Sequence, residues 1–236
     1  MSIPEITISG EKIFEVFNFP VTNTLLLSFV ITFSIIAAFS AVFKKAAFLP
    51  GRLQNFFEWI LESLYNFFHS ITLSKEKTIE IFPIAATLFL LILASNLMEL
   101  VPGVGIFHFL RSPSSDLNFT LPLALFSILY INFLALRRVG LFHYLKKFIN
   151  IKNPILFFVG FLEGIGEMTR IFSLAIRLFG NLFAGEVLLI VTSFLFAYLL
   201  PLPFLGLEIM VAVIQAFIFS SLIVIFYASS VQTEHG

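Results

Sequence analysis

The sequence predicts an all-α integral membrane protein, and three observations support this fold class. Hydrophobic residues make up 59% of the 236 residues and charged residues 12%, which is about half the charged share of an ordinary soluble domain. The mean hydropathy is +1.02. Uncharged apolar runs reach the length of about 20 residues that a helix needs to cross the hydrocarbon core of a bilayer. We therefore expect one membrane domain over residues 1–236, with most of its surface facing lipid.

Charge and cysteine content exclude several other classes of function. The 14 basic and 14 acidic residues give a net charge of zero, so nothing favours a nucleic-acid partner. The chain has no cysteine, which excludes disulfides, thiolate metal sites and cysteine nucleophiles.

The first crossing is predicted over residues 24–43, which contain no charge. Residues 1–20 are a mixed polar lead-in that we expect to lie at the membrane surface. Lys44, Lys45 and Arg52 follow the helix, and basic residues gather on the cytoplasmic side of membrane proteins. The N-terminus is therefore predicted to be external.

Residues 51–74 are predicted to form an amphipathic helix along the cytoplasmic interface rather than a crossing. Polar side chains interrupt this segment, while aromatic and aliphatic side chains supply an apolar side. The polar set is Arg52, Glu58, Glu62 and His69, and the apolar set is Phe56, Trp59, Ile60, Phe67 and Phe68. We interpret His69 as a solvated residue rather than a ligand.

The second crossing is predicted over residues 81–100, with Pro83 in its first turn, where a proline is tolerated. The crossing ends in two polar residues, Asn96 and Glu99. Lining a polar path, capping the helix and lying at a wet interface are equally good readings of this pair.

An external loop over residues 101–118 leads to the third crossing, predicted over residues 119–136. Asp116 or Asn118 is available as the N-cap of that helix. Basic residues then return the chain to the cytoplasmic side: Arg137, Arg138, Lys146, Lys147 and Lys152.

Two long helices are predicted at the end of the chain, over residues 154–200 and 204–229, with a turn at residues 201–203. A straight helix of 47 residues would be about 70 Å long, more than twice the roughly 30 Å of the hydrocarbon core. The first helix must therefore be steeply inclined or break near Gly180. Charged residues within it argue against two ordinary spans: Glu163, Glu167, Arg170, Arg177 and Glu186.

Arg177 is the most informative residue in the chain because it lies in the middle of an apolar run. A charge at the bilayer centre costs about 2.5–3.5 kcal/mol on insertion scales and roughly 10–17 kcal/mol in simulations. It therefore needs a water-filled cavity or a partner carboxylate. Its guanidinium stays protonated, so it is a fixed charge and not a proton carrier. A purely structural salt bridge, or an arginine that extends to the interface, is the alternative reading.

The helical period of about 100° per residue places small and charged residues together with Arg177 on one face. That face comprises Gly166, Arg170, Ser173, Gly180, Asn181 and Ala184, with Glu163 close to it. Glu186, nine residues after Arg177, is predicted to point to the opposite side. Such a face allows another helix to approach a cation closely.

The ten residues from Arg177 to Glu186, Arg-Leu-Phe-Gly-Asn-Leu-Phe-Ala-Gly-Glu, resemble the signature of subunit a of the F-type (F1Fo) ATP synthase in its bacterial form. The residues at 96–102, 116–120 and 215–219 are also similar to stretches of that family. The resemblance covers most of the chain from residue 24 onward.

The resemblance implies the architecture of the last two helices. They would form a long, membrane-inclined hairpin against a rotating ring of c subunits, so residues 154–200 would be one inclined helix. It also implies five crossings, a cytoplasmic C-terminus and a bacterial plasma (inner) membrane.

The resemblance also implies the site residues and partners. Arg177 would be the central residue, with Gln215 beside it and Glu163 near a cytoplasmic exit. The full set of proton-pathway residues would be Glu186, Glu208, Gln215, Asn181, Glu163, Arg170, Asn96 and Glu99. The implied partners are the c-ring, subunit b of the peripheral stalk, the rest of the F1Fo complex and membrane lipid. The subunit would not be an enzyme by itself and would use no cofactor or metal.

The implied function is a stator subunit that couples proton flow to ring rotation. A proton would enter an external half-channel, pass to a c-subunit carboxylate, travel with the ring and leave by a cytoplasmic half-channel. Arg177 would favour the ionised form of the passing carboxylate and so block a direct leak. Glu186 and Glu208 take two inlet positions at which many family members have one histidine. If they touch, they would share a proton, and their contact stays open.

A secondary transporter that binds an anionic substrate at Arg177 is the alternative function. Such a protein would show inverted repeats or helices broken at matching positions in two halves, and we see neither in the sequence.

Overall fold

The computed structural model describes residues 10, 12–16, 19–44, 50–101, 111–140, 154–195 and 201–232. Five helices of the described chain are long and apolar enough to cross a membrane, which confirms the predicted class. They are α1 (Asn23–Phe43), α3 (Lys75–Leu97) continued by a 3-10 turn, η1 (Met98–Leu100), α4 (Leu117–Val139), α6 (Pro154–Leu195) and α7 (Pro201–Gln232). The remaining helix, α2 (Arg52–Thr72), lies between α1 and α3 along the chain.

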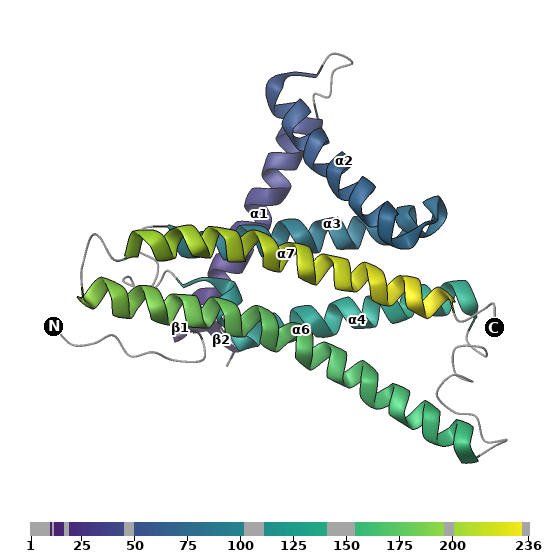
Figure 1. The fold of residues 1–236 in the computed structure, drawn as a ribbon. Coiled ribbons are helices and arrows are strands. Elements are labelled where there is room, and N and C mark those ends of the chain that lie inside the picture. Colours follow the sequence, from purple (N-terminus) through teal and green to yellow (C-terminus); the bar gives the residue numbers. More distant parts are fainter. Residues whose placement is uncertain are drawn as a thin grey trace.

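Helices α6 and α7 form the predicted antiparallel hairpin (Figure 1). α6 is a single helix of 42 residues, so it does not break at Gly180. At 1.5 Å per residue it is about 63 Å long, and α7 about 48 Å. The predicted turn at residues 201–203 is wrong, because both prolines lie in the first turn of α7. A proline is tolerated there since its missing N–H would have no partner within the helix.

The predicted amphipathic character of α2 is confirmed, because its apolar residues gather on one side of the helix; its place along the cytoplasmic interface stays a prediction. Leu64 and Phe68 are buried, whereas Leu53, Phe56 and Trp59 are exposed. α2 packs on α3 and α7. In Figure 1 the N-terminal end of α2 lies beside the end of α1, and both extend away from the other long helices. His69 is exposed as expected, and its Nδ1 is 3.0 Å from Thr78 Oγ1.

The second crossing begins earlier than predicted, at Lys75, and this places Pro83 in the helix interior. The prediction of a first-turn proline is therefore wrong. The first residues of α3, from Lys75 to Glu80, are mostly charged, and a helix continues readily beyond the hydrocarbon core when its charged end is hydrated. The third crossing is likewise extended at both ends, and the predicted N-cap is Asp116, whose Oδ1 accepts a hydrogen bond of 2.9 Å from the Asn118 amide.

A two-stranded hairpin, β1 (Lys12–Val16) and β2 (Phe19–Thr22), is the one non-helical element of the described chain, and the sequence analysis did not predict it. It leads directly into α1. Asp116 joins this region to the start of α4, because its Oδ2 accepts hydrogen bonds from the Gly10 amide at 3.1 Å and the Thr24 hydroxyl at 2.6 Å. A Cβ on Gly10 would lie 2.5 Å from Thr24 Oγ1.

The core lies where α3, α4, α6 and α7 pack on one another. Alanines permit the close approach of these helices. The fully buried alanines include Ala85, Ala124, Ala135, Ala175, Ala212 and Ala216, and the largest fully buried side chains include Tyr227, Phe68, Phe219, Ile81, Ile92, Ile131, Leu178 and Leu182.

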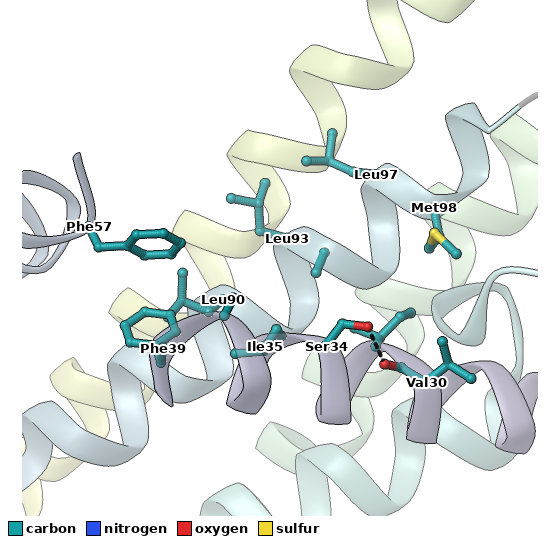
Figure 2. A pocket seen from close by; sticks show the side chains of 12 residues that line it. Val30, Ser34, Ile35, Phe39, Phe57, Leu90, Leu93, Leu97 and Met98 are labelled. Carbon is teal, nitrogen blue, oxygen red and sulfur yellow. Dashed lines mark hydrogen bonds between the residues drawn. The ribbon is translucent and has the colours of Figure 1, made fainter. Parts of the chain in front are cut away.

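An apolar groove of about 380 Å³ lies between α1, α2 and α3 (Figure 2). Among the described residues that line it, Ser34 has the one polar side chain and donates a hydrogen bond of 2.7 Å to the Val30 carbonyl. No charged or titratable residue of the described chain lines this groove, so it does not contribute to the site described below.

Several sequence predictions fall outside the described residues. These are the lead-in over residues 1–9, Lys45, the loop over residues 102–110, Lys146, Lys147, Lys152, and residues 196–200 at the end of the helix predicted over residues 154–200.

Candidate functional site

The outward face of α6 carries the central residue of the predicted site. Ser173, Arg177, Asn181 and Ala184 are all exposed, as the helical period predicts. Arg177 Nη2 donates a hydrogen bond of 3.3 Å to Ser173 Oγ, one turn earlier. Within the described part of the chain no carboxylate lies within ion-pair distance of Arg177. The guanidinium therefore faces away from its own subunit.

Gln215 joins the outward face to α7. It is 2% exposed, and its Oε1 accepts a hydrogen bond of 3.1 Å from Asn181 Nδ2. Asn181 lies one helical turn beyond Arg177. The hydrogen bond to Asn181 therefore holds the Gln215 side chain beside α6, at a level one helical turn beyond Arg177.

A buried group of charges lies beyond Arg177, toward the end of the bundle where α6 and α7 join. We call Glu99, Arg111, Glu186 and Glu208 the carboxylate cluster. Their exposed fractions are small, at 6% for Glu99, 7% for Arg111 and 4% for Glu208. Glu186 and Glu208 are both close enough to Glu99 to act on it electrostatically, and Arg111 acts with the opposite sign.

Arg111 holds Glu186 in the cluster. Its Nη2 is 3.4 Å from Glu186 Oε2. The same guanidinium donates to Ser115 twice, from Nε to the hydroxyl and from Nη2 to the carbonyl, each at 3.4 Å. Glu186 therefore points away from the Arg177 face, as predicted, and toward the residues that precede α4.

Glu208 lies directly against the backbone of Gly185, the neighbour of Glu186. A Cβ added to Gly185 would be 1.9 Å from Glu208 Oε1 and 2.4 Å from its Cδ. The glycine thus permits a close approach that any other residue would prevent.

Several buried polar atoms in the cluster and around it have no hydrogen-bond partner among the described residues. They include both carboxyl oxygens of Glu99, Glu208 Oε2, Ser95 Oγ, Asn96 Oδ1, Ser114 Oγ and Thr120 Oγ1. Asn96 does not cap its helix; its Nδ2 donates a long hydrogen bond of 3.4 Å to the Ala212 carbonyl of α7. Buried polar groups are rarely left unpaired, and ordered water commonly satisfies them.

A second polar group lies near the other end of α6. Glu167 is 9% exposed; its Oε2 accepts a hydrogen bond of 2.7 Å from Asn132 of α4, and its Oε1 is 3.7 Å from Arg170 Nη1. The Arg170 guanidinium also lies over the Phe226 ring of α7, 4.8 Å from its centroid. Glu163 is half-buried on the same part of α6. We call Glu163, Glu167, Arg170 and Asn132 the exit group.

Near the same end of the bundle, a second arginine joins three helices. Arg138 Nη1 of α4 is 2.9 Å from Glu80 Oε2 of α3, and Arg138 Nη2 is 3.2 Å from Glu76. Tyr227 of α7 donates its hydroxyl to the same Glu80 oxygen. This network closes the bundle at that end.

The inner face of α6 between the two polar groups is apolar. Leu174, Ala175, Leu178 and Leu182 are each at most 2% exposed. Within the described residues, the polar groups at the two ends of α6 are therefore separated by packed hydrocarbon.

The structure brings together most of the residues predicted from the sequence, in two separate places. Glu99, Glu186 and Glu208 lie near one end, Glu163 and Arg170 lie toward the other, and the Arg177 face lies between them. Sequence reasoning missed Arg111 and Asn132. The signal available for Arg111 was its position five residues before the helix cap, Asp116, in a segment predicted to be an external loop.

Comparison with known proteins places the chain in a family. Residues 24–228 match the family described as ATP synthase A chain. Three relatives named ATP synthase subunit a illustrate the similarity. The protein from Legionella pneumophila strain Philadelphia 1 is 33% identical over 222 residues, which cover 94% of this chain and 91% of the relative. The protein from Moorella thermoacetica is 31% identical, covering 95% and 96%, and that from Geobacter sulfurreducens is 33% identical, covering 81% and 80%. The chain therefore belongs to the ATP synthase A chain family, the proton-translocating subunits of the Fo sector, and is a multi-pass bacterial membrane protein that works within a multi-subunit complex.

Proposed function

We propose that this chain forms two proton half-channels against a ring of c subunits and so couples proton flow to rotation. One observation carries the proposal: Arg177 is exposed on an apolar helix, has no carboxylate partner within the described residues, and lies between two polar groups that do not connect. A fixed intramembrane cation of this kind needs a counter-charge. A carboxylate on a neighbouring helix of another subunit supplies it.

The carboxylate cluster is the proposed inlet. Glu186 is about 14 Å from Arg177 along the helix axis, because nine residues rise by 1.5 Å each. Carboxyl and hydroxyl oxygens that lack protein partners in this region favour a hydrated chamber, and carboxyl groups can bind and release protons there. Asn181 and Gln215, joined by their hydrogen bond, lead from the cluster toward the arginine face.

The exit group is the proposed outlet. Glu167 lies ten residues before Arg177 on α6, about 15 Å away along the helix axis and in the direction opposite to Glu186. Arg170 pairs with Glu167 and not with a group on the Arg177 face, so its proposed role is to hold the outlet carboxylates. With the inlet on the external side, the N-terminus is external and the C-terminus cytoplasmic, as the basic residues after α1 and α4 suggest.

The packed leucines on the inner face of α6 argue against a continuous pore through this subunit. A proton that reaches Arg177 from the inlet finds no polar route to the outlet within the described residues. The arginine favours the ionised form of a carboxylate in front of it, so a proton that arrives there is passed to the next carboxylate of the ring. Subunit b and the rest of the complex would hold this subunit still while the ring turns.

The test is replacement of Arg177 in the assembled complex. Arg177→Ala is expected to abolish proton-driven ATP synthesis in membrane vesicles, while the ATPase activity of the detached soluble sector is unchanged. Arg177→Lys is also expected to fail, because lysine lacks the broad planar set of donors and can lose its charge when desolvated.

Arg137→Ala is the matched control. Arg137 also belongs to a spanning helix, but its guanidinium lies over the Phe133 ring at 4.4 Å and is not a member of either polar group. Normal coupled synthesis in the Arg177→Ala variant would refute the proposal, and an equal loss in the Arg137→Ala variant would show that any lost arginine disrupts the complex.

A further inference from the structure

The carboxylate cluster contains three acids and one base, and the four side chains are not equivalent. Arg111 contacts Glu186 at 3.4 Å. Both oxygens of Glu99 and one oxygen of Glu208 lack a hydrogen-bond partner among the described residues. Of the three carboxylates in the cluster, Glu186 is therefore the one that pairs with Arg111.

Arg111 is held firmly enough to act as a fixed charge. It is 7% exposed, and Ser115 accepts hydrogen bonds from two of its nitrogens. Ser115 belongs to a short 3-10 turn, η2 (Pro113–Ser115). That turn is fixed in place by Ser112, whose hydroxyl donates a hydrogen bond of 2.9 Å to the Ser95 carbonyl of α3. The carboxylate of the next residue, Asp116, already accepts hydrogen bonds from the Gly10 amide and the Thr24 hydroxyl.

Charge balance then divides the roles. An arginine beside a carboxylate favours the ionised form of that carboxylate. A buried carboxylate without a partner is costly, and two such groups close together resist double ionisation, so they titrate as a pair. Arg111 and Glu186 account for one positive and one negative charge, which leaves Glu99 and Glu208 to hold one exchangeable proton.

We propose that Arg111 is a positioning residue of the inlet: it holds Glu186 as a permanent counter-ion, so that the exchangeable proton is carried by the Glu99 and Glu208 pair. This inference rests on the proposed function, because it assigns roles within the proposed inlet. Glu186 would then set the charge of the chamber and would not itself be protonated in each transfer.

The experiment measures passive proton flux as a function of pH in membrane vesicles from which the soluble ATPase sector has been removed. Three variants of the assembled complex are compared with the parent: Arg111→Gln, Glu186→Gln and the double variant. The amount of the subunit in the membrane is measured for each by immunoblotting, so that flux is expressed per assembled complex.

The expected result is a pair of opposite shifts. Arg111→Gln removes the positive charge that acts on Glu99 and Glu208, so the pH of half-maximal flux moves upward by about one unit. Glu186→Gln removes the negative charge that balances Arg111 beside the same two groups, so that pH moves downward. The double variant restores the charge balance, and its profile returns to within about half a unit of the parent profile. A purely structural salt bridge would lower the amount of assembled complex in the single variants without opposite shifts.

Arg111→Lys keeps the inference testable if Arg111→Gln does not assemble. Lysine preserves the charge but not the two hydrogen bonds to Ser115, so its flux profile should keep the parent position even if the maximum flux falls severalfold. The proposal would be overturned if Glu186→Gln kept the pH of half-maximal flux of the parent. It would also be overturned if that pH moved in the same direction in Arg111→Gln and Glu186→Gln.

Arg177→Ala, assayed for ATP synthesis in parallel, separates the two failures. If it abolishes synthesis while the Arg111 and Glu186 variants keep the parent profile, the assignment of Arg111 is wrong and the proposed function stands. If it leaves synthesis normal, the proposed function itself fails.

Discussion

Gly185 provides the sharpest test of the inlet because its substitution moves one carboxyl group by a known amount. A Cβ at this position would lie 1.9 Å from Glu208 Oε1, 2.4 Å from Cδ and 2.7 Å from Oε2. An ordinary contact of a Cβ begins at 3.4 Å, so in Gly185→Ala the nearest oxygen has to move by about 1.5 Å. The obstacle is the end of a flexible side chain, and we therefore expect displacement of the carboxyl rather than unfolding.

A displacement of this size is large for a proton relay. Misplacing a reacting group by about 1 Å can lower a rate about 100-fold. Gly185→Ala is therefore expected to reduce passive proton flux by roughly 10- to 100-fold, with a normal amount of subunit in the membrane. The assay is flux in vesicles without the soluble ATPase sector, normalised to the assembled complex.

Gly206→Ala is the matched control, since Gly206 lies two residues before Glu208 on α7 and a Cβ there has no neighbour within 4 Å. Its flux should equal that of the parent. If Gly185→Ala also conducted normally, the position of the Glu208 carboxyl would not matter for conduction, and the inlet would have to run through other residues.

Two further predictions concern the ends of the bundle. Arg170→Gln should slow turnover severalfold without uncoupling, because the Arg170 guanidinium pairs with Glu167 and stacks on Phe226 within its own subunit; loss of ATP-driven proton pumping as complete as in Arg177→Ala would contradict this. Asp116→Ala removes the cap of α4 and the partner of the Thr24 hydroxyl, so we expect a loss of about 1–3 kcal/mol in stability, measured as lower thermal resistance of the detergent-solubilised complex. Unchanged resistance would show that the end of the bundle at which α4 begins is held by other contacts.

The face of α6 was predictable because a regular helix fixes directions. Counting 100° per residue from Arg177 is enough to place Ser173 and Asn181 outward and Glu186 inward, and both placements are observed. The hairpin of α6 and α7 followed from the length of the apolar run together with the family resemblance. Local periodicity thus determines which residues share a side of a helix, whatever the helix packs against.

The partners of those residues were not predictable in the same way. Arg111 contacts Glu186 across a separation of 75 positions in the sequence, and Asn132 contacts Glu167 across 35. No periodic pattern relates positions so far apart. Glu208 and Gln215 lie seven residues apart on α7 and are both buried, yet the approach of Glu208 to Gly185 depends on the register between two helices. The start of α3 was missed for a different reason, since a membrane helix can extend beyond the hydrocarbon core and its charged first turns resemble a loop.

The length of α6 has a consequence for the direction in which a proton must move. Glu167 and Glu186 are 19 residues apart, about 28 Å along the helix axis. A helix of about 63 Å fits a bilayer of roughly 30 Å hydrocarbon, or about 45 Å with headgroups, only if it is inclined by roughly 45–60°. At that inclination the two polar groups are offset sideways by roughly 20–25 Å, with Arg177 between them. The apolar inner face of α6 offers no polar route across this offset within the described residues. In the proposed function, a proton that enters at one group and leaves at the other would therefore be carried laterally past the arginine, and a carboxylate on a turning ring would provide that movement.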